Sequence, residues 1–120
     1  MIRRITPADC GAIAALEATL FATAFDQARL MTLQTNPVFC GFVDLVPDQD
    51  QPQLTSADDL ASYLGGYLLA MMIDGEAEIL SIGVTPDRQS QGVGKQLLQH
   101  FFDHGVSQNM ARVLLEVAED

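Results

Sequence analysis

The chain has 120 residues, of which 48% are hydrophobic and 18% are charged, a composition typical of one folded domain rather than of a disordered segment. Sixteen acidic residues against six basic ones give a formal net charge of −10, which argues against nucleic acid or an anionic membrane as a partner. No apolar run is long enough to span a bilayer, and the N-terminus turns polar too early for a signal peptide. Cys10 and Cys40 lack metal-ligand spacing, so we expect reduced, buried thiols in a cytoplasmic protein.

The first third of the chain predicts a strand followed by two helices. A short apolar-flanked run indicates a strand over residues 2–5. Thr6 and Pro7 then supply a hydroxyl N-cap and a proline at the first helical position, and apolar residues recur at helical spacing over 7–20. A second helix is expected over 25–33.

The middle of the chain predicts three strands, over 38–46, 63–73 and 77–84. Residues 47–58 hold no periodic pattern and much of the negative charge, which indicates an acidic loop. Gly65-Gly66 marks a bend or bulge within the second of these strands. Asp74-Gly75 separates two apolar runs, which is a strong hairpin signal.

The last third predicts a helix and a final strand. The hydrophobic period changes to 3.6 near Gly92, and His104-Gly105 is expected to close that helix. A final strand over 112–117 completes a β-α-β unit, so it should run parallel to the strand over 77–84 with a right-handed crossover. His100 and His104 are four residues apart, but without a third ligand we expect surface histidines rather than a metal site. The order β-α-α-β-β-β-α-β indicates one α/β domain with a mixed sheet over 1–120.

The chemistry of the chain is concentrated where the strand over 77–84 enters a glycine-spaced loop that opens a helix. Free N–H groups at such a helix start bind anions, and glycine lets a phosphate approach closely. The segment fails as a Walker loop, because Gln96 follows Gly94-Lys95, and it lacks the third glycine of a dinucleotide site. It does fit the pattern Gln/Arg-x-x-Gly-x-Gly/Ala, through Gln89, Gly92 and Gly94.

This pattern, after the strand end Ile82-Gly83-Val84, resembles the acyl-CoA site of the GNAT family of N-acetyltransferases, and the element order is similar over 1–120. Within the family, the segment is most similar to bacterial ribosomal-protein alanine N-acetyltransferases. The resemblance implies the GNAT fold with acetyl-CoA as co-substrate and no metal. It implies backbone contacts to pantetheine from the strand end and a pyrophosphate cradle over 90–95, so the cofactor-binding residues would be Ile82, Gly83, Val84, Arg88, Gln89, Ser90, Gln91, Gly92, Val93, Gly94 and Lys95.

The resemblance also implies a catalytic residue. Glu116 lies in a Leu-Glu-Val core like that of the family, which makes it the expected general base. Glu78 is the competing carboxylate: it either lines the acceptor groove or belongs to the polar face of its strand. The family's pattern continues with a helix carrying a tyrosine acid and two more strands, which the 120 residues do not contain. We therefore expect a C-terminally truncated member, whose strand over 112–117 presents an edge that favours a homodimer.

The resemblance predicts transfer of an acetyl group to a primary amine, with the α-amine of a basic protein or peptide as the favoured acceptor. Two alternatives stay open at this point. One is acetylation of small amines, polyamines or antibiotics, which the acidic loop would suit equally well. The other is a non-catalytic module that binds CoA.

Overall fold

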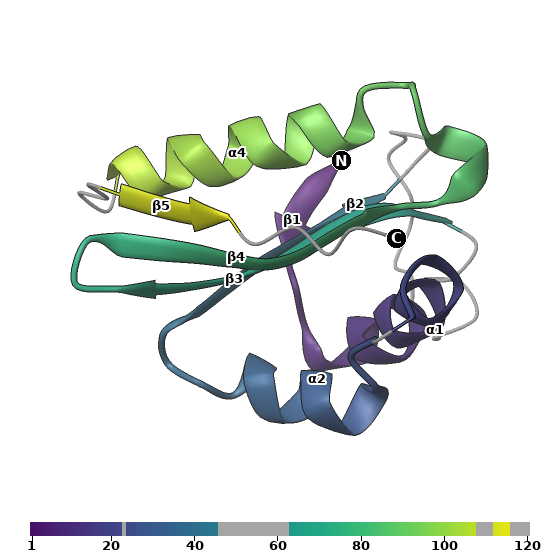
Figure 1. Ribbon diagram of the computed structural model, residues 1–120, viewed down its shortest axis with the longest axis horizontal. Helices are drawn as coiled ribbons and strands as arrows, with labels where there is room; N and C mark the ends of the chain where they lie inside the picture. Colours follow the sequence, from purple (N-terminus) through teal and green to yellow (C-terminus); the bar gives the residue numbers. More distant parts are fainter. Residues whose placement is uncertain (23, 46–62, 108–111, 116–120) are drawn as a thin grey trace.

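The computed structural model describes residues 1–22, 24–45, 63–107 and the backbone of 112–115. Five strands form one twisted sheet in the order β1-β2-β3-β4-β5 (Figure 1). The first four pair antiparallel, and β5 pairs parallel to β4, as the β-α-β pattern predicted. The strands are β1 (Ile2–Arg4), β2 (Phe39–Leu45), β3 (Leu64–Ile73), β4 (Glu76–Val84) and β5 (Arg112–Leu115).

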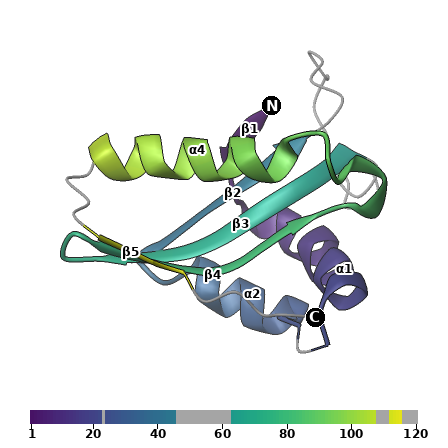
Figure 2. The ribbon, with the colours of Figure 1, turned by 45° about the horizontal axis from the view of Figure 1, so that its top comes forward.

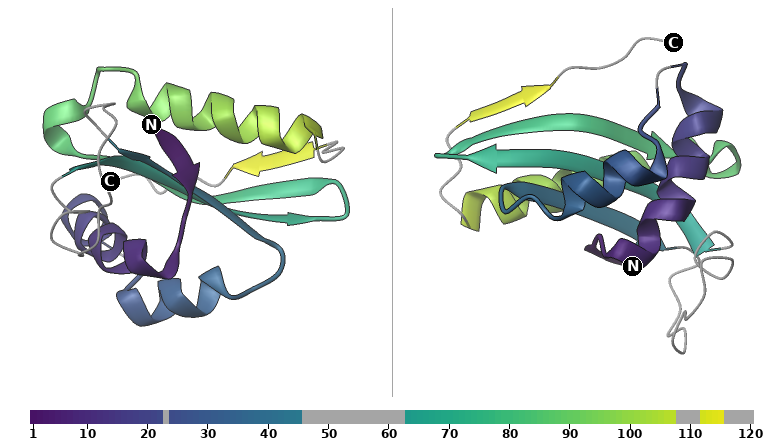
Figure 3. Two further views of the ribbon diagram at one scale, coloured as in Figure 1. Left: turned by 180° about the vertical axis from the view of Figure 1, so that it is seen from behind. Right: turned by 90° about the horizontal axis from the view of Figure 1, so that it is seen from below.

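Helices cover both faces of the sheet (Figure 2). A 3-10 turn, η1 (Pro7–Asp9), leads into α1 (Cys10–Leu20), and α1 lies with α2 (Gln27–Gln34) on one face. A second turn, η2 (Pro86–Arg88), leads into α4 (Val93–Ser107), which lies on the opposite face. Figure 3 shows the same three layers from behind and from below.

Each face of the sheet carries its own apolar cluster, because side chains alternate along a strand. The α1/α2 face buries Ile5, Cys10, Ala12, Ile13, Leu16, Leu30, Val43, Leu45, Leu64, Tyr67 and Leu69. The α4 face buries Cys40, Phe42, Leu68, Ala70, Ala77, Ile79, Val93, Leu97 and Phe101. The sheet is therefore covered on both sides, which explains why β3 reads as a nearly continuous apolar run rather than an alternating one.

Two irregularities interrupt the ladders of β3. The register against β2 shifts so that Gly65 is skipped, which confirms the expected bulge in this glycine pair. The register against β4 shifts between Ser81 and Ile79, which leaves Leu80 as the extra residue. Leu80 packs against the cluster on the α1/α2 face, and Ser81 bonds to α1 on the same face. The bulge therefore places two successive side chains of β4 on one side.

The first helix begins as Thr6 and Pro7 predicted, with Thr6 and Asp9 forming a capping box. The Asp9 carboxylate is 2% exposed and accepts bonds from the Thr6 backbone N–H at 2.7 Å and from the Arg3 guanidinium at 2.7 and 2.8 Å. This bidentate ion pair ties β1 to the start of α1.

The predicted elements are confirmed within a few residues, with one clear error. The helix expected to close at His104-Gly105 continues to Ser107. Gly105 is buried within it, and the Ser107 hydroxyl donates to the His104 carbonyl at 2.6 Å. Packing thus outweighs the cost of about 1 kcal/mol for glycine inside a helix. The loop 47–58 and Glu116 lie outside the described residues. Within the described part, no helix is both long and apolar enough to cross a membrane.

Candidate functional site

The carboxyl end of β4 is pinned to β3 before the chain leaves the sheet. Thr85 donates to the Gly65 carbonyl from its backbone N–H at 2.9 Å and from its hydroxyl at 3.3 Å. The next turn closes with a bond from the Arg88 N–H to the Thr85 carbonyl at 2.9 Å. Val84, at the end of the strand, is half-buried and accepts a further bond from the Gln89 side-chain amide at 3.2 Å. The first residue of the Gln-x-x-Gly-x-Gly pattern therefore folds the loop back onto the strand end.

The loop that follows takes two left-handed backbone positions, at Ser90 (φ 72°) and Gly92 (φ 85°). Only glycine adopts such a φ without strain, which explains why glycine occupies position 92. A β-carbon at Gly92 would meet no protein atom within 4 Å, so the space beside it is open. At Gly94 the nearest atom to a β-carbon would be the Val84 Cγ2, at 3.5 Å.

The N-terminus of α4 opens toward this space. Its first helical bond runs from the Gln96 N–H to the Gly92 carbonyl at 3.0 Å, so the N–H groups of residues 93–95 precede the helical ladder. They carry the positive end of the helix dipole. Arg88 and Lys95 add two of the six basic side chains of the chain. Backbone donors, open space at a glycine and local positive charge together fit an anionic, phosphate-bearing ligand.

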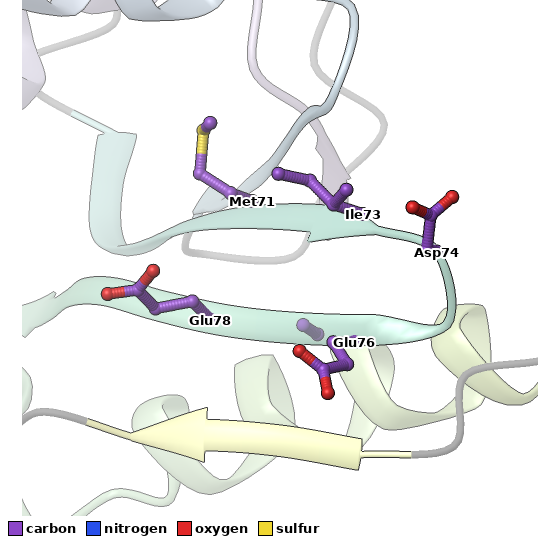
Figure 4. Close-up of a pocket in the computed structure, with 6 residues that line it drawn as sticks. Met71, Ile73, Asp74, Glu76 and Glu78 are labelled. Atoms are coloured by element: carbon purple, nitrogen blue, oxygen red, sulfur yellow. The ribbon is translucent and has the colours of Figure 1, made fainter.

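Glu78 lies on β4 on the α2 side of the sheet and is exposed. It lines two hollows. One, of about 360 Å³, follows the β3–β4 hairpin beside Met71, Ile73, Asp74 and Glu76 (Figure 4). The other, of about 370 Å³, lies between α2 and the sheet, and we name it the α2 groove. Its lining residues are Phe25, Arg29, Thr32, Leu33, Asn36, Met71, Glu78 and Leu80. Glu78 therefore contributes a carboxylate to both hollows.

The lining of the α2 groove combines apolar and polar side chains and includes one charge of each sign. The Arg29 guanidinium lies 4.4 Å from the centre of the Phe25 ring, a cation–π contact that fixes both side chains. Glu78 contributes the opposite charge from the sheet. An acceptor with an apolar body and a cationic amine would match this lining.

Behind the groove lies a buried carboxylate, Glu17 of α1, which is 1% exposed. It accepts hydrogen bonds from the Tyr67 hydroxyl at 2.5 Å, from the Ser81 hydroxyl, and from the Phe25 backbone N–H at 3.4 Å. Burial and the neighbouring Glu17 carboxylate raise the pKa of Tyr67 well above its ordinary value, so the phenol stays a donor. Three donors satisfy a charge that would otherwise be costly in the core.

His100 and His104 both pack edge-on against the Phe42 ring, with centroids 4.6 and 5.6 Å away. Among the described residues, no group of three potential ligands could hold a metal ion. Both cysteines are free and buried, as the sequence predicted.

The predicted cofactor residues therefore lie together at one end of β4 and the start of α4, and Glu78 lies on the α2 side of the same strand. The cluster of Glu17, Tyr67 and Ser81 was not predicted. A signal for it exists in the sequence, because Glu17 occupies the apolar face of its helix, four residues after Ile13 and one after Leu16. An acidic residue on that face must find buried donors.

The sheet, its helices on both faces and the strand–loop–helix segment define the α/β acyltransferase class of domain. The sequence model of the Acetyltransferase (GNAT) family matches residues 14–120. The chain therefore belongs to the GNAT acetyltransferase family.

A curated relative is the [ribosomal protein bS18]-alanine N-acetyltransferase of Escherichia coli K12, which is 34% identical over 65 residues, covering 54% of this chain and 41% of the relative. The Shigella flexneri enzyme of the same name matches with the same values. The sequence match thus spans less than half the length of these relatives.

Solved structures share the fold. The ribosomal-protein-S18-alanine N-acetyltransferase from Escherichia coli superposes with a TM-score of 0.76 at 21% identity, covering 98% of this chain and 66% of that one. Ard1 from Thermoplasma volcanium gives a TM-score of 0.75 at 24% identity, covering 100% and 72%. An aminoglycoside acetyltransferase from an uncultured soil metagenomic sample gives 0.71 at 20% identity, covering 99% and 78%.

Proposed function

We propose that the chain is the acetyl-CoA-binding part of an N-acetyltransferase that acts on a primary amine. The favoured acceptor is the α-amine of a protein or peptide. The observation that supports this is the start of α4, where a left-handed Gly92 borders open space and the N–H groups of 93–95 precede the helical ladder. The buried, reduced cysteines suit a cytoplasmic enzyme.

Acetyl-CoA would supply the acetyl thioester. The segment 90–95, together with Arg88, would hold its pyrophosphate, and the backbone of 82–84 would bind its pantetheine arm. In this proposal the Val84 N–H stabilises the oxyanion of the tetrahedral intermediate. Gln89, which bonds to the Val84 carbonyl, keeps the loop and the strand end in register.

The amine must lose a proton before it attacks. An α-amine costs roughly 1–1.4 kcal/mol to deprotonate at pH 7, whereas a lysine amine costs about 4.6 kcal/mol. A single carboxylate suits the smaller cost, and this favours an N-terminal acceptor. We assign the base to Glu116 and the orientation of the ammonium to Glu78, which faces the α2 groove.

Calorimetry with acetyl-CoA tests the proposal directly. The parent chain should bind, and Gly94→Glu should abolish binding, because a carboxylate would then occupy the helix start beside the phosphates. Gly11→Glu, which adds the same charge on α1, is the matched control and should bind like the parent. A folded parent chain without affinity for acetyl-CoA would overturn the proposal.

The acidic hollow beside the β3–β4 hairpin favours a second candidate acceptor, a small polyamine or aminoglycoside. Release of CoA, measured with an alanine-initiated peptide, spermidine and an aminoglycoside, separates the candidates. Glu116→Gln should lower turnover strongly with unchanged acetyl-CoA affinity. Binding of acetyl-CoA without turnover on any of the three would instead indicate a non-catalytic module.

The expected homodimer is tested by sedimentation, which measures the molecular mass of the chain in solution.

A further inference from the structure

The proposed acetyl transfer leaves the buried carboxylate of Glu17 without a role. Its two oxygens receive hydrogen bonds from three segments that are distant in sequence. Tyr67 of β3 and Ser81 of β4 both donate to Oε1, and the Phe25 N–H, just before α2, donates to Oε2. One side chain of α1 therefore connects two strands of the sheet with the segment that enters α2.

Packing alone does not require a carboxylate at this place. Position 17 shares a helix face with Ile13 and Leu16, both buried in the same apolar cluster. A buried, fully bonded charge is seldom more stabilising than an apolar side chain of similar volume, but its bonds are directional. The main contribution of Glu17 is thus to the positions of its hydrogen-bond partners rather than to the stability of packing between α1 and the sheet.

The partners of Glu17 belong to the two halves of the proposed site. Ser81 directly precedes the segment 82–84, which would bind pantetheine. Phe25 forms a wall of the α2 groove, together with Arg29 stacked on its ring. The Tyr67 ring lies over Gly83, since a β-carbon there would be 2.6 Å from the ring. A shift of the segment 82–84 would therefore displace the Glu17 carboxylate, which bonds to Phe25 in the groove wall.

We infer that Glu17 is a positioning residue, which sets the Phe25 wall of the acceptor groove relative to the strand segment that presents the thioester. The inference rests on the proposed function, because that proposal places CoA at the strand segment and the acceptor amine in the α2 groove. Occupation of the strand segment by CoA is then transmitted through Ser81 and Glu17 to Phe25. The acceptor groove takes its final shape after the cofactor binds.

Nuclear magnetic resonance of the ¹⁵N-labelled full chain, titrated with CoA, tests this inference. In the parent chain, CoA should shift the Phe25 amide signal and slow its hydrogen exchange. In Ser81→Ala and Glu17→Gln, the shift at Phe25 should fall at least threefold, while the Kd for CoA stays within about threefold. Ser81→Thr, which keeps the hydroxyl, should restore the response. Ser107→Ala, which removes a hydroxyl from the far end of α4, is the matched control.

The outcomes separate the two claims. A parent chain that does not bind CoA overturns the proposed function and the inference with it. If CoA binds but Phe25 does not respond, or responds equally in Ser81→Ala, the inference is wrong and the proposed function stands. Tyr67→Phe keeps the ring over Gly83 and leaves the Ser81–Glu17 and Glu17–Phe25 bonds in place, so it should keep the Phe25 response. A response that is lost in Tyr67→Phe as fully as in Ser81→Ala would contradict transmission through Ser81.

Discussion

The Tyr67 ring and Gly83 face each other across β3 and β4. The two residues are register partners, and a β-carbon at position 83 would lie 2.6 Å from both the ring and the hydroxyl of Tyr67. No real β-carbon tolerates that approach. Packing inside the protein therefore demands a glycine at position 83, whatever ligand the strand end binds.

Gly83→Ala should destabilise the fold by about 1–3 kcal/mol, because the Tyr67 ring has to move away from β4. Urea denaturation measures the loss. Gly11→Ala is the matched control, since its β-carbon would be 3.5 Å from the nearest atom and α1 gains helix propensity, up to about 1 kcal/mol. Equal stability of the two variants would contradict the packing argument.

Arg88→Gln and Lys95→Gln should each weaken acetyl-CoA binding by roughly 2–5-fold, because each removes one charge beside the proposed pyrophosphate cradle. The loss should shrink as salt is added, since counterions screen exposed charges. Calorimetry at two ionic strengths measures both effects. Arg29→Gln, which alters a basic residue of the α2 groove, should leave acetyl-CoA binding unchanged. A loss as large in Arg29→Gln would mean that net charge, not the local site, controls affinity.

The free energy of unfolding should fall as the pH rises above about 8.5, because buried thiols and a buried phenol resist ionisation in the folded chain. Burial raises the pKa of the Cys10 and Cys40 thiols, and burial with Glu17 raises the pKa of Tyr67. The unfolded chain releases these protons first, so folding stability is fully present below the unfolded pKa values and is lost above them. Urea titrations at pH 7, 9 and 10.5 measure the decline. Tyr67→Phe should flatten it above about pH 10, where an unfolded tyrosine ionises.

A second loss is expected on the acid side. Burial, the Arg4 guanidinium and His100 lower the pKa of His104 below its ordinary value of 6.5. The unfolded chain therefore takes up this proton first, and the stability contributed by the neutral imidazole is present above that value and lost as the pH falls. His104→Gln should reduce the slope of unfolding free energy between pH 7 and pH 5. An unchanged slope would mean that protonation of carboxylates, and not of His104, causes the loss of stability at low pH.

The sequence predicts the fold well where local signals and packing agree. Thr6-Pro7 marks the start of the first helical segment, and Asp74-Gly75 closes the hairpin with positive φ values of 50° and 81°. Gly105 shows where a local signal fails. A glycine after an apolar helical face predicts a helix end, but tertiary contact buries it within α4. The cofactor-binding residues that the family resemblance implies share one continuous segment, so the chain itself keeps them close together.

The hydrogen-bonded cluster of Glu17, Tyr67 and Ser81 could be identified only from the tertiary structure. Its members are separated by up to 64 residues, and Ser81 reaches α1 only because the β4 bulge turns it to that face. Alternation along an uninterrupted strand assigns Leu80 and Ser81 to opposite faces. No sequence pattern reveals an extra residue of this kind when the strand carries no glycine or proline at the bulge.

The bulge at Leu80 also acts as a spacer within the candidate site. Glu78 faces the α2 groove and Gly83 faces Tyr67, so both lie on the side of the sheet to which Leu80 and Ser81 turn. Deleting Leu80 would restore regular alternation without moving either residue to the other face. It would bring the Glu78 carboxylate nearer to the strand end by about one residue step, roughly 3.3 Å. In the proposed reaction, the length of this strand, and not only its side chains, thus sets the distance between an amine held at Glu78 and the thioester.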